Sequence, residues 1–198
     1  MDRPKDPTAF HRSANTSFKT RMGSPLRLCN VSTSKNTSSN ADVVLEGGFS
    51  CEKAFGKHLF ELLATDDEMS KNFNRAMSVY TDLVMNKVLE TYKGFEGVSQ
   101  VVDVGGGVGT NLKLIVSNYP QIKGVNFDLP QVIKDAVPFP GVEHLSGYMF
   151  TKIPKAEVIF MKSMLHNWSD KLCLKLLKVC YDALSQNGCC FVSYSSGS

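Results

Sequence analysis

The sequence predicts an α/β domain built on a parallel sheet, and two observations support this prediction. From residue 95 onward, short apolar or β-branched segments alternate with segments of helical periodicity. A run of glycines directly follows the first of these strands and precedes a helix, which is typical of a sheet that binds a cofactor at its carboxyl edge. With 198 residues, 42% hydrophobic and 21% charged, the chain has the balance of one globular domain with a tail.

The first 41 residues differ in composition from the rest of the chain. They hold seven Lys or Arg, two Asp and twelve Ser or Thr, and large apolar side chains are sparse. Such a segment cannot bury enough surface to offset its backbone entropy, so we expect a disordered basic tail over residues 1–41. The composition is also that of a transit peptide, but Asp2 and Asp6 argue against that role, and we expect a cytoplasmic chain.

Helices are expected in front of the sheet. Residues 43–63 combine a glycine-broken turn with a short helix, and residues 70–93 have the periodicity of a long amphipathic helix. One apolar face of this helix repeats at helical spacing, namely Phe73, Met77, Tyr80, Val84 and Val88. Core packing is the simplest role for such a face. We interpret residues 42–94 as a helical connector and residues 95–198 as the sheet domain.

The sheet domain begins with a short β-branched strand at 101–104, followed by a helix at 110–118. A second strand at 122–127 ends on Asp128, and Pro130 suits the first turn of a helix. The remaining expected elements are strands at 142–145, 156–162 and 189–194, and a helix at 170–185 that Ser169 can cap and Asn187-Gly188 ends.

The composition argues against several classes of protein. No run of about 18 apolar residues occurs, so no membrane-spanning helix and no membrane partner is expected. A net charge of +3 is too small to indicate a nucleic-acid partner. The six cysteines form no CxxC pair and have no His at ligand spacing. This argues against a zinc site and a disulfide scaffold, and for a reduced, intracellular chain.

The glycine-rich turn predicts a cofactor site. Four glycines within residues 105–109 let the backbone approach a ligand that faces the helix N-terminus. Asp103 precedes the turn, where it would repel a dinucleotide pyrophosphate and attract the cationic groups of S-adenosylmethionine. Asp128, at the tip of the second strand, is placed to accept hydrogen bonds from ribose hydroxyls or to cap a helix. The pattern favours an adenosylmethionine site that includes Gly105 and Gly107 over a dinucleotide-binding oxidoreductase.

His166 is the candidate acid–base group. It follows the fourth strand, and open α/β sheets place their sites at the carboxyl ends of strands. An imidazole titrates near neutral pH and can remove the proton of a phenol, whose phenolate form is the better nucleophile. The alternative is a packed loop residue beside Trp168.

Many short segments of the chain form a recognisable series, and they include LEGG, FNRAMS, VLETYKGFEGV, VVDVGGGVGT, IKGVNFDLP, PGVEH and LHNWSD. From Val44 onward this series resembles the plant small-molecule O-methyltransferases of the caffeic acid type. The resemblance implies a Rossmann-like class I adenosylmethionine-dependent methyltransferase sheet, a small aromatic (phenolic) substrate and a homodimer. The residues to which it assigns roles are Gly105, Asp128, Met149 and Lys162 for the cofactor, His166 as the catalytic base, and Phe73 and Met77 in the acceptor pocket.

The sequence departs from the family pattern at four positions near these residues. Tyr148 replaces an Asp, Ser163 replaces a Trp, Asn167 replaces an Asp, and a Glu that orients the histidine falls at Tyr194. The family's long N-terminal helical domain and its last strands are absent, so we expect a truncated sheet with an exposed fifth strand. An imidazole without its carboxylate loses control of its tautomer. A catalytically impaired remnant, which binds cofactor weakly or pairs with an intact relative, is therefore the alternative function. No carboxylate cluster for a metal is seen.

Overall fold

The computed structural model describes residue 52 and residues 55–193. The predicted tail over residues 1–41, most of the predicted glycine-broken turn and Tyr194 lie outside the described residues. The chain divides into two compact units between Tyr80 and Thr81. In the described part of the chain, no helix is both long enough and apolar enough to span a membrane.

Two helices precede the sheet. α4 spans Leu59–Thr65 and α5 spans Asp67–Thr91, so the predicted long helix begins three residues earlier than expected. The earlier start has a local cause, because Oδ1 of Asp66 accepts a hydrogen bond from the backbone N–H of Met69 at 2.9 Å. The division between the two units falls inside α5.

The unit that begins at Thr81 in α5 contains a sheet of five strands. These are β1 (Gln100–Val104), β2 (Lys123–Asp128), β3 (Val142–Ser146), β4 (Ala156–Lys162) and β5 (Leu184–Ser193). Their order is β3-β2-β1-β4-β5, and every neighbouring pair is parallel. The α/β class and the parallel sheet predicted from the sequence are confirmed.

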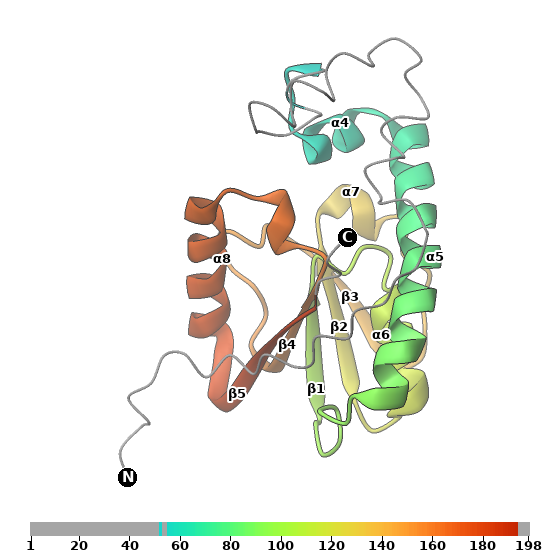
Figure 1. Ribbon diagram of the computed structural model, residues 1–198, viewed down its shortest axis with the longest axis vertical. Helices are drawn as coiled ribbons and strands as arrows, with labels where there is room; N and C mark the ends of the chain where they lie inside the picture. Colours follow the sequence, from blue (N-terminus) through green and yellow to red (C-terminus); the bar gives the residue numbers. More distant parts are fainter. Residues whose placement is uncertain (1–51, 53–54, 194–198) are drawn as a thin grey trace. The chain divides into compact units, whose positions relative to one another are not determined.

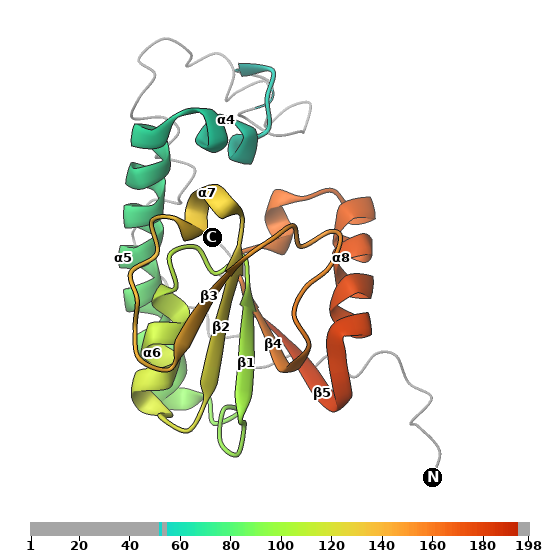
Figure 2. The same ribbon diagram turned by 180° about the vertical axis from the view of Figure 1, so that it is seen from behind.

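Helices cover both faces of this sheet (Figures 1 and 2). α6 (Thr110–Asn118) and the last turns of α5 lie on one face, and α8 (Asp170–Ala183) lies on the other. The short helices α7 (Pro130–Ile133) and η1 (Leu165–Asn167) follow β2 and β4. Alternating strands and crossover helices produce this three-layer arrangement, as parallel sheets require.

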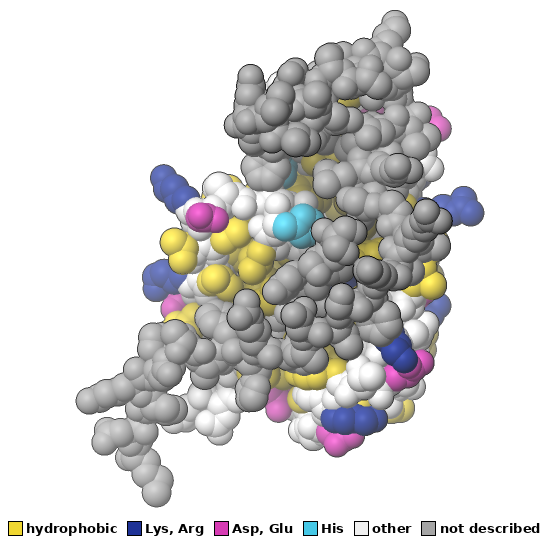
Figure 3. Space-filling model, viewed as in Figure 1, with side chains coloured by type: hydrophobic (Ala, Val, Ile, Leu, Met, Phe, Trp, Pro, Cys, Tyr) yellow, Lys and Arg dark blue, Asp and Glu magenta, His cyan; other side chains and the backbone are white. Residues whose placement is uncertain are grey.

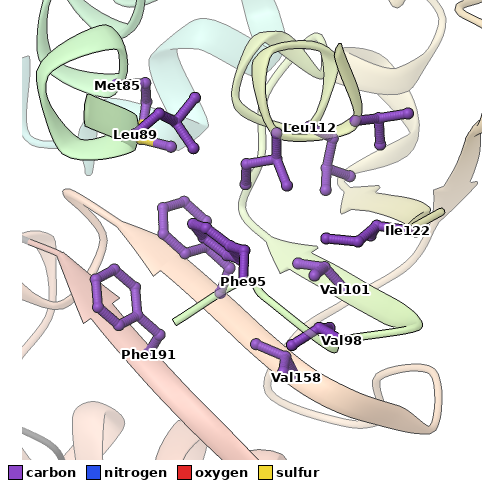
Figure 4. Close-up of a cluster of buried hydrophobic side chains, with 12 residues drawn as sticks. Met85, Leu89, Phe95, Val98, Val101, Leu112, Ile122, Val158 and Phe191 are labelled. Atoms are coloured by element: carbon purple, nitrogen blue, oxygen red, sulfur yellow. The ribbon is translucent and has the colours of Figure 1, made fainter. Parts of the chain in front are cut away.

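The core has one hydrophobic cluster on each face of the sheet. In the first, Met85 and Leu89 of α5 pack with Phe95 and with Phe191 of β5 (Figure 4). In the second, Leu176, Cys180 and Ala183 of α8 pack against Val102, Val104 and Ile159. The apolar face predicted for this helix includes Val88, which packs against the first cluster. It omits Met85 and Leu89, which are the most buried apolar side chains of α5.

The boundary between α8 and β5 corrects the prediction. The sequence predicts a helix at 170–185 that Asn187-Gly188 ends, whereas α8 ends at Ala183 and Leu184 already pairs with Ala156. The pairing then shifts register before Cys189. Pairing with β4 wins over the local helix signal because it gives the backbone of β5 its hydrogen-bond partners.

β5 forms one edge of the sheet and pairs with β4 among the described residues. Its apolar side chains are not equally exposed, because Phe191 is buried whereas Cys189 is exposed. On neighbouring α8, Leu174 and Tyr181 are exposed, and hydrophobic side chains are visible over this part of the molecule in Figure 3.

Candidate functional site

Loops from three strands reach one edge of the sheet at the point where the strand order reverses. β1 pairs with β2 on one side and with β4 on the other. The chain therefore adds β2 and β3 on one side of β1 and then crosses to the other side to form β4 and β5. The loops that follow these parallel strands therefore leave the same edge from neighbouring positions (Figure 1). Ligands of open α/β sheets bind at such a point. The structure brings the glycine turn, Asp128 and the His166 loop to this edge.

Gly107 is the open position of the glycine turn. Its φ of +61° lies in the left-handed region that favours glycine, and no described atom lies within 4 Å of the place that a Cβ would take. At Gly105 the corresponding place is filled by the side chain of Met164. The loop after β4 therefore covers Gly105, whereas Gly107 leaves room for a ligand.

Asp128 joins the end of β2 to the glycine turn. Its Oδ2 accepts a hydrogen bond from the N–H of Gly107 at 2.8 Å, and its Oδ1 accepts one from the N–H of Leu129 at 2.7 Å. Burial raises the pKa of Asp128 although both bonds lower it. α7 begins after Leu129 without a side-chain cap, so the helix-cap alternative is not what the structure shows. A carboxylate has further lone pairs, which can accept hydrogen bonds from additional donors.

Asp103 is fully buried in β1, directly before the turn. Its Oδ2 accepts a hydrogen bond from Nδ2 of Asn111 at 2.9 Å. Burial raises the pKa of Asp103 to about 7, against the lowering effects of the Asn111 bond and of the positive charge of Lys162. A cationic ligand would favour the charged form of this side chain.

Lys162 is the last residue of β4 and is 6% exposed. Burial lowers the pKa of its ammonium group, and the negative charge of Asp103 raises it. The two charges interact from neighbouring strands, so Lys162 belongs to the same site as Asp103.

The buried hydrogen-bonding groups of the site indicate which kind of cofactor it can bind. Oδ1 of Asp103, Oδ1 of Asn111 and Oδ1 of Asn126 are buried and have no hydrogen-bond partner among the described residues. Oxygen atoms of this kind require donors, and leaving them unsatisfied costs free energy. Adenosylmethionine brings ammonium and hydroxyl donors and positive charge, whereas a pyrophosphate brings only acceptors and negative charge. The residues present fit the former.

His166 lies in η1 and is exposed. Partial desolvation lowers the pKa of its imidazole, so the neutral form that can accept a proton prevails at neutral pH. No hydrogen bond joins either ring nitrogen to a residue within 55–193. Asn167, at one of the family departures, instead donates to the carbonyl O of Ser163 at 3.2 Å. Ser163 has a φ of 55°, which is uncommon outside glycine.

Met149 follows β3 and is half-buried against the second hydrophobic cluster. Its neighbour Tyr148 is 62% exposed. Phe150 packs edge-on against Trp168 with ring centroids 4.8 Å apart, which joins the loop after β3 to the loop after β4. Met149 thus lies in a loop that is joined to the loop after β4, and its role in cofactor binding stays a prediction.

Phe73 and Met77 are half-buried residues of α5 in the unit that ends at Tyr80. They belong to a different unit from the glycine turn, and their role in an acceptor pocket stays a prediction.

Three polar residues at the site were not identified from the sequence. They are Asn111, which donates to Asp103, Asn126, which donates to the carbonyl O of Gly107, and His144, which is hydrogen-bonded to Asn126. The available signal was Asn126, a polar side chain between Val125 and Phe127 in the middle of a strand. In the part of the chain that the structure describes, no group of three His, Cys, Asp or Glu side chains is arranged to hold a metal ion.

Comparison with known proteins decides the family. The sequence matches the O-methyltransferase domain over residues 38–195. The chain belongs to the O-methyltransferase domain family. The resemblance to O-methyltransferases of the caffeic acid type is confirmed, and the family match does not favour the dinucleotide-binding alternative.

Caffeic acid 3-O-methyltransferases are among its relatives. The protein of that name from Prunus dulcis is 57% identical over 147 residues, which cover 74% of this chain and 40% of that protein. The corresponding protein 1 from Ocimum basilicum is 55% identical over 148 residues, 75% of this chain and 41% of that protein. The chain thus spans about two fifths of the length of these O-methyltransferases.

Solved methyltransferase structures share the fold. LaPhzM has a TM-score of 0.74 at 28% identity, over 87% of this chain and 56% of that chain. Human N-acetylserotonin methyltransferase, solved in complex with SAM, has a TM-score of 0.70 at 26% identity, over 77% of this chain and 46% of that chain. The predicted Rossmann-like methyltransferase sheet is confirmed.

Proposed function

We propose that this O-methyltransferase domain binds S-adenosylmethionine at its glycine turn, and that the complete protein methylates a hydroxyl group of a small aromatic molecule. The observation that carries the proposal is the open face of Gly107 beside the buried, acceptor-rich group around Asp103. The names of the caffeic acid relatives support a phenolic acceptor, and the SAM-complexed structural relative supports the cofactor.

Each residue of the site has a role in this proposal. S-adenosylmethionine supplies an electrophilic methyl group on a cationic sulfonium. Asp128 would accept hydrogen bonds from ribose hydroxyls, and the negative charge of Asp103 would favour the cation. Lys162 moderates that charge from β4, and Met149 would contribute apolar surface. Holding the two reactants in line is the main contribution expected of the protein.

His166 would take the proton of the acceptor hydroxyl on a ring nitrogen. The neutral imidazole needed for this step is favoured by the lowered pKa of His166. Phe73 and Met77 would line the acceptor pocket. The family resemblance also supports a homodimer, and the cysteine pattern supports a cytoplasmic location, both as proposals.

One observation favours the second candidate, a domain that binds cofactor but transfers methyl groups slowly. His166 has no hydrogen bond to fix its tautomer among the described residues. The side chain of its neighbour Asn167 donates a hydrogen bond to the carbonyl O of Ser163 instead. Losing the carboxylate that orients a catalytic histidine can lower the rate by several orders of magnitude, about 10⁴-fold in serine proteases.

A methyl-transfer assay tests the function and separates the two candidates. The full chain is incubated with radiolabelled S-adenosylmethionine and a panel of catechols, hydroxycinnamates and flavonoids. We expect transfer to a phenolic acceptor that falls at least about 100-fold in His166→Ala, with cofactor affinity unchanged. Binding of cofactor without transfer would support the second candidate, and full activity in His166→Ala would remove the proposed base.

A further inference from the structure

Asn126 lies beneath the glycine turn and uses its amide nitrogen twice. It is fully buried in β2, where it pairs with Asp103 of β1 on one side and with His144 of β3 on the other. Its Nδ2 donates to the carbonyl O of Gly107 at 2.9 Å and lies 3.1 Å from Nδ1 of His144. Nε2 of His144 in turn lies 3.2 Å from the carbonyl O of Val137.

Two backbone carbonyls fix the direction of this chain of hydrogen bonds. The carbonyl O of Gly107 only accepts, so the amide atom that faces it is the nitrogen of Asn126. The same nitrogen then donates its second hydrogen to Nδ1 of His144, which must carry no proton. Nε2 of His144 carries the proton and donates it to the carbonyl O of Val137. Both ends of the chain require the same neutral tautomer.

The network determines the position of Gly107 from both sides of the residue. Asn126 holds its carbonyl, and Asp128 accepts from its N–H. His144 also limits the turn directly, because a Cβ at Gly109 would lie 2.8 Å from its Cε1. The open face of Gly107 therefore depends on a histidine one strand beyond the strand that ends in Asp128.

We propose that His144 is a positioning residue for cofactor binding, which acts through the amide of Asn126 to hold the Gly107 backbone in its ligand-accepting orientation. This inference rests on the proposed function, because it assigns His144 to the proposed cofactor site. His144 itself would touch neither the cofactor nor the acceptor. The charged neighbours of the network are Asp103 on β1, Asp128 at the end of β2 and Lys162 on β4, and no substitution in the test alters them.

The test measures binding of S-adenosylhomocysteine to the full chain by titration calorimetry. His144→Leu removes both hydrogen bonds and should raise the Kd about tenfold. His144→Gln retains an acceptor and a donor, and its Kd should stay within about threefold of the unchanged chain. Asn126→Ala should also raise the Kd, and adding His144→Leu to it should have little further effect because the two residues act in series.

Controls separate this inference from the function on which it rests. Glu143→Gln changes the exposed neighbour of His144 on β3 and should leave the Kd unchanged. No binding to the unchanged chain would contradict the proposed function. Binding that is unchanged in His144→Leu, or effects of the two substitutions that simply add, would overturn the positioning role alone.

A second measurement needs no variant, and it decides the matter if His144→Leu does not fold. Nitrogen NMR of the labelled full chain reports which ring nitrogen of His144 carries the proton. The network requires the proton on Nε2. A neutral imidazole protonated on Nδ1 would overturn the inference.

Discussion

The backbone of Gly107 makes two hydrogen bonds to side chains. Its N–H donates to Asp128, and its carbonyl O accepts from Asn126. Both partners come from β2, so the turn after β1 is fixed by the neighbouring strand. Asp103, in the strand that leads into this turn, is fully buried, and burial raises its pKa to about 7. The turn therefore combines an open backbone face at Gly107 with a buried carboxylate whose pKa is raised.

Replacing Asp128 tests whether its carboxylate binds the cofactor in addition to its contact with the turn. Asp128→Ala should weaken the binding of S-adenosylhomocysteine by about 1–3 kcal/mol, because it removes a charged hydrogen-bond acceptor. Titration calorimetry measures the change, with circular dichroism to confirm the fold. Glu96→Ala, an exposed residue before β1 and so away from the carboxyl edge, is the matched control. An unchanged Kd in Asp128→Ala would contradict the assignment.

The buried Asp103 predicts a specific dependence of stability on pH. Its pKa is raised from 3.8 to about 7 in the folded chain. Between these values the folded state holds a proton that the unfolded state has released, so the free energy of unfolding falls as pH rises. The slope reaches about 1.4 kcal/mol per pH unit.

Asp103→Asn removes this titration while it retains the shape of the side chain. Urea denaturation at pH 5 and pH 7.5 should show that the variant loses about 2–3 kcal/mol less stability than the unchanged chain over this interval. Asp128, whose pKa is also raised, is present in both proteins and contributes to both pH dependences. Parallel pH dependences would show that Asp103 is already ionised at pH 5.

The sequence located the charged members of the site but not the residues that position them. Asp103 and Asp128 stand out because a carboxylate at the end of an apolar strand has few structural uses. His144 has no such signal, since its role depends on the register that places it beside Asn126. Register between parallel strands is set by the packing of the whole sheet and cannot be taken from local sequence.

At the scale of elements, β4 and α6 have the bounds that the sequence predicts, because an apolar run and a glycine before a helix are strong local signals. The predicted boundary between α8 and β5 was wrong because the local signals there compete with pairing across the sheet. Leu184 continues the helical periodicity, but its backbone pairs with Ala156 across the sheet. Long-range pairing of this kind decides the structure where local signals compete.

β5 is predicted to stabilise the domain through one aromatic side chain. Phe191 stacks on Phe160 with ring centroids 5.4 Å apart and also contacts Tyr92. Phe191→Ala should lower the free energy of unfolding by about 3–5 kcal/mol, the usual cost of removing a buried aromatic ring. Guanidinium denaturation provides the measurement. Cys189→Ser, at an exposed position of the same strand, should cost less than about 0.5 kcal/mol. Equal costs for the two would show that β5 is not part of the core.

At the scale of the whole molecule, the match with the O-methyltransferase domain begins at residue 38, close to the composition change that we place at residue 42. The sequence before this point predicts a segment that adds no core. Deleting residues 1–41 should therefore shift the thermal midpoint by only a few degrees, as small surface effects do. Differential scanning calorimetry of the two chains tests this. A larger loss of stability would show that these residues fold onto the domain.

The central claim is that the glycine turn and the carboxylates beside it form a binding site for S-adenosylmethionine. Titration calorimetry of the purified full chain with S-adenosylhomocysteine, and in parallel with NAD, tests it most directly. The structure predicts binding of one S-adenosylhomocysteine per chain and no binding of NAD, because the pyrophosphate would meet Asp103 and the unsatisfied oxygens around it. Binding of NAD, or the absence of S-adenosylhomocysteine binding by a folded chain, would contradict the claim.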